Sequence, residues 1–313
     1  MGSDSLIRDT VGRARSLVGD GRIRILAGEH LAGPFRSELP ELPAEAYLVE
    51  PRARGTCPVL AWAAWELMRQ DPDAVLVSLH ADHLIRPTEA FQETVHAAAR
   101  IAARDDLLLT VAVTPDRVET GYGHIQPGEA LAHGDGPRTF RVAAFHEKPD
   151  ADTARRYTDQ GYLWNTGIFV WKAAVFLQEV ERHAPEVATC FPILEEEGPR
   201  AFFDAVPVCV VDTAVLERSE RVACVEATFA WDDVGNWASL ARTRDGDEAG
   251  NVTEGDVRVV DGSGNVVWSE GGRLVLWGVD DLVAVRTGDV TVVLPVDRAP
   301  DLKALLAELE DDG

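Results

Sequence analysis

Carboxylates stand at points where this sequence changes from apolar runs to polar turns. Asp82 follows the apolar run AVLVSL, in the segment LHADH, and Asp233 lies between two tryptophans in FAWDDVGNW. Carboxylate oxygens just beyond the ends of buried strands can hold Mg²⁺ against phosphate groups. An ordinary turn or helix-cap aspartate is the alternative interpretation of each residue.

Polar side chains of other kinds occur in three further segments. Glu147 and Lys148 lie in FHEKPD, where the lysine offers a point charge to a phosphate and the glutamate accepts hydrogen bonds from sugar hydroxyls. Taken alone, the pair also fits an exposed ion pair at a strand end. Asn165, before the apolar run IFVW, which is expected to be a strand, can bind hydroxyls, and Gly121 and Gly123 allow a ligand to approach the backbone closely.

Apolar strands alternate with amphipathic helices over residues 1–244, and these elements must position the polar segments. AVLVSL at 74–79 and LLLTVAV at 107–113 are continuous apolar runs, typical of strands covered on both faces. Between them, a helix opened by Pro87 has one apolar face, made by Phe91, Val95, Ala98 and Ile101. This rhythm predicts a doubly wound, Rossmann-like α/β domain with a mostly parallel sheet.

The residue pattern changes after Arg244, where short runs of β-forming residues are separated by Gly, Asp and Asn. Their spacing predicts a small β-rich domain over residues 245–313, and the segment from Ala299 is expected to be a terminal helix. The chain is therefore expected to have a large α/β domain followed by a small β domain.

The composition argues against a nucleic-acid-binding or membrane-spanning protein. The 313 residues are 46% hydrophobic, enough for a sizeable core, and the formal net charge of −23 argues against binding nucleic acid or anionic membranes. No apolar stretch is long enough for a membrane helix, and the N-terminus lacks a signal-peptide core, so a cytoplasmic protein is expected. The cysteines are widely spaced in sequence and are expected to be reduced and mostly buried: Cys57, Cys190, Cys209 and Cys224.

In order and spacing, these segments resemble the mannose-1-phosphate guanylyltransferases, within the wider sugar-nucleotide pyrophosphorylases. The stretches that carry the resemblance are EPRARGTCP (50–58), LHADH (79–83), RVETGYGHI (117–125), FHEKPD (145–150), YLWNTGIF (162–169), VDTAVLER (211–218) and FAWDDVGNW (229–237). The resemblance covers nearly the whole chain. It implies transfer of GMP from GTP to mannose-1-phosphate, which gives GDP-mannose and pyrophosphate.

The resemblance also implies roles for individual residues. Asp82 and Asp233 would hold Mg²⁺ against the phosphates, and Lys148 would meet the phosphate of mannose-1-phosphate; these three are the expected catalytic residues. Glu147 and Asn165 would bind mannose hydroxyls. The family pairs its nucleotidyltransferase domain with a small β-helix-like domain that often forms a dimer contact, so a homodimer is an expected assembly.

Three further positions are expected to bind substrate on the same ground. The backbone at Gly121 and Gly123, together with Asp212, would line the sugar pocket. Thr56 and its neighbours would help to seat the guanosine half of the nucleotide.

This sequence departs from the family pattern at its start. Members open with a strand and a glycine-rich loop of the form GGxGTRLWPLSR, whose backbone amides would cradle the triphosphate. The chain begins at the helix that normally follows, and the similar-looking segment 26–29 (LAGE) falls in the register of a later strand. The expectation is an N-terminally truncated, impaired catalyst. Smaller departures are His80, where proline is usual, and Thr213, where tyrosine is usual.

Two other functions fit the same residues. A pyrophosphorylase for another hexose-1-phosphate would share most of these motifs, although FAWDDVGNW and EPRARGTCP favour the mannose and guanine branch. A non-catalytic subunit that binds sugar nucleotides, or regulates an enzyme that does, would explain the missing loop. Retention of Asp82, Lys148 and Asp233 argues against that second alternative.

Overall fold

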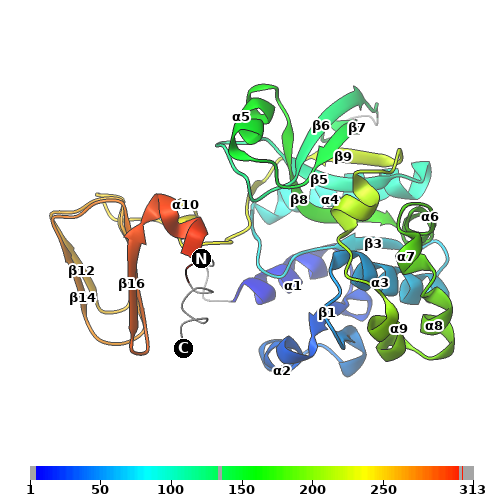
Figure 1. The fold of residues 1–313 in the computed structure, drawn as a ribbon, viewed down its shortest axis with the longest axis horizontal. Coiled ribbons are helices and arrows are strands. Elements are labelled where there is room, and N and C mark those ends of the chain that lie inside the picture. The colour runs from blue at the N-terminus through cyan, green and yellow to red at the C-terminus, as the bar shows by residue number, and fades with distance from the viewer. Residues whose placement is uncertain (1–4, 133–135, 303–304, 306–313) are drawn as a thin grey trace. The chain divides into compact units, whose positions relative to one another are not determined.

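The computed structural model describes residues 5–132, 136–302 and 305. The chain divides into two compact units, of which the larger contains residues 5–81 and 85–231 and the smaller contains residues 82–84 and those from 232 onward. Figure 1 shows helices packed around strands in the larger unit and long flat ribbons of strands in the smaller one.

A six-stranded sheet forms the middle of the larger unit, with its strands in the order β3-β8-β5-β9-β7-β6. In that order the strands are β3 (Val75–Ser78), β8 (Leu163–Lys172), β5 (Leu108–Val113), β9 (Val222–Glu226), β7 (Thr139–His146) and β6 (His124–Ala130). Two short sheets accompany it: β1 (Ile25–Gly28) pairs with β2 (Tyr47–Glu50), and β4 (Leu84–Arg86) pairs with β10 (Ala230–Asp232).

The strand directions correct the expectation of a mostly parallel sheet. β5 and β9 are parallel, but β8 is antiparallel to both β3 and β5. β7 is likewise antiparallel to β9 and β6. The expectation is wrong because a continuous apolar run reports burial on both faces, and an antiparallel strand in the middle of a covered sheet is buried in the same way.

Helices cover both faces of this sheet. Alternate residues of β5 point to opposite sides, so Leu108 packs in one apolar cluster with Ala61 and Leu109 packs in the other with Phe91. The covering helices and turns are α1 (Leu6–Leu17), η1 (Asp20–Arg22), α2 (Glu29–Glu38), η2 (Ala44–Ala46), α3 (Thr56–Gln70), α4 (Thr88–Asp105), α5 (Ala151–Asp159), α6 (Ala173–His183), α7 (Pro185–Ala188), α8 (Phe191–Glu196), α9 (Pro199–Ala205) and the π-helical turn η3 (Asp212–Leu216). The predicted doubly wound α/β character is therefore confirmed.

Parallel strands stack on one another in the smaller unit. Val252 lies opposite Val266, and Val266 lies opposite Val283, so equivalent apolar residues of successive turns form one column. Beside that column, the buried Asn265 amide donates to the Asn251 side-chain oxygen at 3.0 Å. This is the β-helix-like arrangement that was expected. Its elements are α10 (Ala238–Thr243), β11 (Val252–Glu254), β12 (Val257–Val260), β13 (Val266–Ser269), β14 (Leu274–Trp277), β15 (Leu282–Thr287), β16 (Val290–Pro295) and η4 (Val296–Asp301).

The larger unit ends at Trp231, and the chain continues in the smaller unit from Asp232. The domain boundary predicted at residue 244 stays a prediction. Most of the terminal helix expected from Ala299 lies outside the described residues. All four cysteines are buried, as expected. Among the described residues, no helix is long and apolar enough to cross a membrane.

Candidate functional site

A bulge interrupts β8 at the segment WNTG. Thr110 of β5 lies opposite Phe169, but two residues later Ala112 lies opposite Asn165, so β8 carries two extra residues between these pairs. Gly167 takes a positive φ of 70°, and a Cβ there would lie 2.5 Å from the His80 imidazole. The sequence predicts a strand starting after this motif, whereas the motif lies inside the strand. A bulge of this kind redirects a side chain without ending the sheet.

The redirected Asn165 side chain joins three other parts of the larger unit. The Thr110 hydroxyl donates to its Oδ1 at 2.6 Å, and its Nδ2 donates to Asp212 Oδ1 at 3.1 Å. Its backbone N–H donates to the Gly123 carbonyl at 2.8 Å. Thr110 is fully buried and Asn165 is 8% exposed, so these hydrogen bonds fix the amide in one orientation.

Asp212 lies at the start of the π-helical turn η3 and is only partly accessible to solvent. Burial raises the pKa of this carboxyl to about 6, and the nearby negative charge of Glu147 contributes in the same direction. The positive charge of Lys148 opposes this rise. The charge of Asp212 therefore changes near pH 6.

Glu147 and Lys148 follow directly after β7. Lys148 Nζ lies 2.9 Å from Glu147 Oε1, and this hydrogen bond raises the pKa of the lysine. The Glu147 backbone N–H donates to Glu217 Oε1 at 3.1 Å. Lys148 is 63% exposed along its side chain, so its ammonium group is accessible to a ligand as well as to Glu147. The ion pair that was the alternative interpretation is thus present, and it lies beside Asp212.

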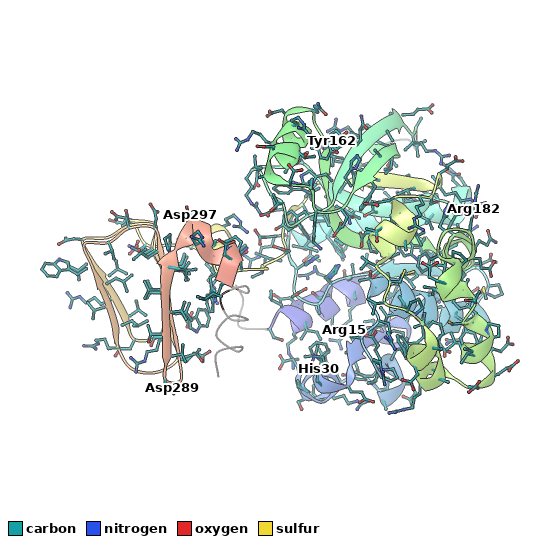
Figure 2. The ribbon with its side chains drawn as sticks, in the orientation of Figure 1. Arg15, His30, Tyr162, Arg182, Asp289 and Asp297 are labelled. Carbon is teal, nitrogen blue, oxygen red and sulfur yellow. The ribbon has the colours of Figure 1, made fainter. Side chains whose placement is uncertain are left out.

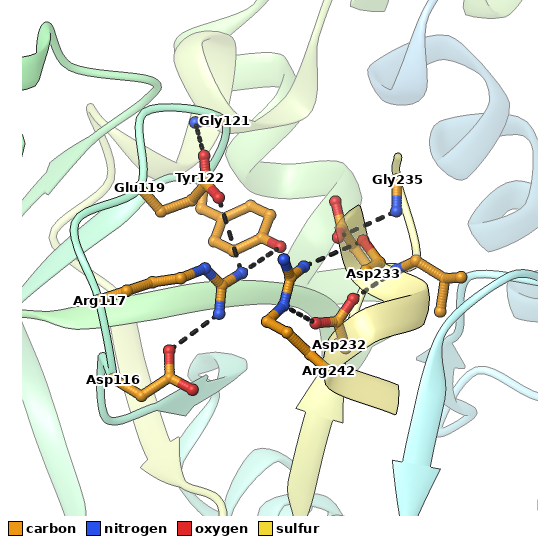
Figure 3. Close-up of polar contacts among 11 residues, drawn as sticks. Asp116, Arg117, Glu119, Gly121, Tyr122, Asp232, Asp233, Gly235 and Arg242 are labelled. Carbon is orange, nitrogen blue, oxygen red and sulfur yellow. Dashed lines mark hydrogen bonds and ion pairs between the residues drawn. The ribbon is translucent and has the colours of Figure 1, made fainter. Parts of the chain in front are cut away.

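The backbone of Gly123 packs closely against Glu147. A Cβ at Gly123 would lie 2.8 Å from Glu147 Oε2, so only glycine fits this position without moving the carboxylate. The Gly121 N–H donates to Glu119 Oε1 at 3.0 Å, which closes the preceding turn, as Figure 3 shows. In the same turn Arg117 donates to the Tyr122 hydroxyl at 3.2 Å.

Thr56 reaches the same cluster from the N-terminus of α3. Its hydroxyl accepts a hydrogen bond from the Val211 N–H at 2.9 Å, next to Asp212 in the chain. Gly55, with φ of 84°, makes this contact possible, because a Cβ would lie 2.5 Å from the Cys209 carbonyl oxygen. The predicted nucleotide and sugar residues of the larger unit are therefore linked through short contacts.

Aromatic rings cover the chain just before the bulge. Tyr162, labelled beside α5 in Figure 2, stacks on Tyr157 with 4.2 Å between ring centroids. His146 stacks on the same Tyr157 ring at 5.0 Å. These contacts hold α5 against the strand that carries Asn165 and against the end of β7.

Asp82 belongs to a short segment rich in potential metal ligands. Among the described residues, one group of His, Cys, Asp and Glu side chains has ligand atoms within 4.8 Å of one another, and it consists of His80, Asp82 and His83. His83 is buried, whereas the other two side chains are exposed. Asp233 is not a member of this group.

Asp233 lies in a tight polar turn of the smaller unit. Its Oδ1 accepts from the Gly235 N–H at 3.2 Å, while the neighbouring Asp232 accepts from the Val234 N–H at 2.8 Å (Figure 3). Asp232 also forms an ion pair with Arg242 at 2.9 Å. Both adjacent acids therefore help to hold the turn together.

Two residues of the cluster are absent from the sequence-based expectations. Thr110 orients Asn165, and its signal is that it is the one polar residue of the run LLLTVAV. Glu217 accepts from the Glu147 backbone and lies in VDTAVLER, but nothing in its spacing indicates that role. The predicted Thr56, Gly123, Glu147, Lys148, Asn165 and Asp212 are brought together in the larger unit, whereas Asp82 and Asp233 belong to the smaller one.

The chain is similar to known nucleotidyltransferases. A profile of the family described as Nucleotidyl transferase matches residues 22–249. Alginate biosynthesis protein AlgA of Pseudomonas aeruginosa is 32% identical, in a match that covers 100% of this chain and 66% of that protein. Mannose-1-phosphate guanylyltransferase of Salmonella montevideo is also 32% identical, with 99% and 68% covered. The chain thus spans about two thirds of the length of these curated relatives.

Solved structures give the same result for the fold. A crystal structure from Thermus thermophilus, described as a mannose-1-phosphate geranyltransferase, matches with a TM-score of 0.84 and 30% identity, covering 97% of this chain and 89% of that one. A mannose-6-phosphate isomerase from Helicobacter pylori matches with a TM-score of 0.62 and 23% identity, covering 74% and 91%. At that identity the second match shows the fold alone.

The raised pKa of Asp212 predicts a pH-dependent stability. Between its ordinary value of 3.8 and about 6, the folded protein holds this proton more firmly than the unfolded chain does. The free energy of unfolding therefore falls as pH rises through that window. Asp212→Asn removes the titration and keeps an oxygen that accepts from Asn165. Relative to the wild type, this variant should gain about 2–3 kcal/mol between roughly pH 4 and roughly pH 7, measured by urea denaturation.

Asp159→Asn is the matched control, because it removes the same charge from an exposed position at the end of α5. If Asp212→Asn and Asp159→Asn change with pH in the same way, the effect arises from net charge, and Asp212 is not the titrating group.

Proposed function

This chain belongs to the nucleotidyl transferase family, among its mannose-1-phosphate guanylyltransferases, and we propose that it transfers GMP from GTP to mannose-1-phosphate. A phosphate oxygen of the sugar phosphate attacks the α-phosphorus of GTP in line. The bond from that phosphorus to the bridging oxygen of the β-phosphate breaks, so that pyrophosphate leaves and GDP-mannose remains. No covalent enzyme intermediate is needed.

One observation carries the proposal. Four distant segments converge on Asn165 and Asp212 in the larger unit, and they contribute Thr56, Thr110, Gly123 and the Glu147–Lys148 pair. A structural cluster would pair its polar atoms and exclude solvent, but this one leaves a lysine ammonium exposed beside two carboxylates. Such a mixture of fixed acceptors and an accessible cation suits a ligand that carries both hydroxyls and a phosphate.

The sugar half is assigned to the acceptors of this cluster. In the proposal, Glu147 and Asn165 bind mannose hydroxyls, and Asp212 and the backbone at Gly121 and Gly123 line the pocket. Asn165 is held by Thr110 before any ligand arrives, so hydroxyl recognition requires little reorganisation. The glycine at 123 lets the backbone of that turn lie close to the Glu147 carboxylate.

The phosphate half needs positive charge in a protein of net charge −23. Lys148 supplies it, because its ammonium is exposed and already oriented by Glu147 at 2.9 Å. A fixed cation at this point attracts the sugar phosphate and neutralises charge as the new bond to phosphorus forms. Thr56, at the N-terminus of α3, is proposed to seat the guanosine half, where helix N–H groups favour oxygen acceptors.

A divalent cation is part of the same proposal, with Mg²⁺ as the ion. Asp82 and Asp233 would hold it, and both have carboxylate oxygens of the kind that Mg²⁺ prefers. Asp82 belongs to the group with His80 and His83, so potential metal ligands surround it. The carboxylate donors of the proposed pair suit a hard cation. When bound, such an ion would neutralise charge on the transferring phosphate groups.

A substrate panel tests the proposal. Calorimetric titration should rank GDP-mannose at least about tenfold tighter than GDP-glucose, ADP-mannose or UDP-glucose, because the sugar acceptors and the nucleotide segment both discriminate. Pyrophosphate release should follow the same order with mannose-1-phosphate and GTP. The Asp82→Asn/Asp233→Asn double variant is the control, and it should release no pyrophosphate. Equal binding of all four nucleotides would rule the proposal out.

Lys148 generates a more specific prediction. Lys148→Ala should raise KM for mannose-1-phosphate by roughly tenfold to a hundredfold, because it removes a charge-assisted contact to phosphate. KM for GTP should change by less than about twofold. The prediction concerns a ratio, so it holds at whatever absolute rate the chain reaches.

Lys172→Ala is the matched control, because Lys172 pairs with Asp106 at 2.8 Å and takes no part in the cluster. It should leave both KM values unchanged. If Lys148→Ala weakens GTP more than the sugar phosphate, Lys148 belongs to the nucleotide half of the site.

A further inference from the structure

Cys57 and Cys209 lie side by side although about half the chain separates them. The Cys57 N–H donates to the Cys209 carbonyl at 3.1 Å, and the Cys209 N–H donates to the Arg54 carbonyl at 2.9 Å. Their thiols influence each other, because this contact raises the pKa of Cys57 and lowers that of Cys209. The other cysteines have different neighbours: the Cys190 thiol contacts the Glu186 carbonyl at 3.7 Å, and Cys224 lies in β9.

The backbone geometry suits a disulfide between the pair. A bond joins their sulfurs only when the two Cα atoms are about 4.4–6.8 Å apart. A direct backbone hydrogen bond from Cys57 to Cys209 keeps the Cα atoms within about that range, and each thiol shifts the pKa of the other. Closure therefore needs only a small displacement of the two segments.

The two thiols differ in reactivity. Cys57 is fully buried, and its pKa is raised first by the hydrogen bond with Cys209 and then by burial. The same hydrogen bond lowers the pKa of Cys209, which is 8% exposed. Val208 and Val210 on either side of it are 70% and 40% exposed, in a stretch without helix or strand between α9 and η3. Cys209 is thus the thiol more accessible to a small oxidant, and Cys57 is its fully buried partner.

We propose that Cys57 and Cys209 form a reversible disulfide when the protein meets a hydroperoxide. The Cys209 thiolate attacks the peroxide, breaking its O–O bond, and becomes a sulfenic acid while hydroxide leaves and takes up a proton. The Cys57 sulfur, giving up its proton, then attacks the sulfenic sulfur, and a second water leaves. Two thiols and one hydrogen peroxide thus yield one disulfide and two waters, and thiol exchange reverses the bond.

The disulfide would act on the neighbouring cluster, a consequence that rests on the proposed function. Thr56 adjoins Cys57, and its hydroxyl holds the Val211 N–H at 2.9 Å, next to Asp212. The two backbone segments pack closely here, because a Cβ on Gly55 would lie 2.5 Å from the Cys209 carbonyl oxygen. Drawing the sulfurs to a bond length of about 2 Å must move the segment that carries Asp212.

Mass spectrometry tests the bond itself. The reduced protein is treated with hydrogen peroxide, its remaining thiols are alkylated, and a digest without reductant is mapped. Two of the four cysteines should escape alkylation, the unalkylated protein should lose two hydrogen atoms, and one linked peptide pair should contain residues 57 and 209. Dithiothreitol should restore all four thiols.

Variants separate this pair from the other cysteines. Cys190→Ser/Cys224→Ser should form the bond to the same extent as the wild type. In Cys57→Ala the resolving thiol is absent, so Cys209 should gain oxygen atoms and form no bond. The proposal is overturned if the wild type keeps four alkylatable thiols, gains only oxygen, or links peptides that contain Cys190 or Cys224.

A binding measurement tests the consequence separately. Oxidation should weaken GDP-mannose binding by about tenfold or more in calorimetry, and reduction should restore it, because a displaced Asp212 misaligns the sugar pocket. Unchanged affinity in the disulfide form would refute the coupling to the site. A reduced protein that forms the disulfide but never binds GDP-mannose would refute the proposed function and leave the disulfide standing.

Discussion

The Asn165 amide, held in a bulge of an otherwise regular strand, is the constraint on which the candidate site depends. One end of this amide is fixed by the buried Thr110 hydroxyl and the other by Asp212. Its backbone N–H meets the Gly123 carbonyl at 2.8 Å. Through these bonds the central sheet, the glycine turn and the π-helical turn become parts of one arrangement, and a shift in any of them would reorient the amide.

Charge gives this arrangement its chemical character. Two carboxylates, Glu147 and Asp212, lie near each other, and the exposed Lys148 ammonium lies 2.9 Å from Glu147. Burial of Asp212 and repulsion from Glu147 raise the pKa of Asp212 to about 6, so this cluster holds negative charge with difficulty. A ligand whose hydroxyls donate to these acids stabilises their negative charge, and its phosphate pairs with Lys148. This balance is why we assign the cluster to a sugar phosphate.

Sequence patterns predicted the elements better than their arrangement. Pro87 and the apolar face that includes Phe91 located α4, and the run LLLTVAV located β5, because periodicity and burial are local properties. Contacts between distant segments determine the strand directions, the bulge at Asn165 and the contact of Cys57 with Cys209. Periodicity carries no information about such contacts. The resemblance to a family supplied the expected site residues, which stay predictions, yet Thr110 entered only with the structure, since a threonine in a buried run is usually a satisfied core residue.

A double-mutant cycle on Asn165 and Asp212 tests the central claim, that these two side chains act as one unit in binding the sugar. The affinity for GDP-mannose is measured by calorimetry for the wild type, Asn165→Ala, Asp212→Ala and the double variant. Residues in one hydrogen-bonded network should couple, so the double variant should lose at least about 1 kcal/mol less than the sum of the single losses. Losses that add within about 0.3–0.5 kcal/mol would contradict the account.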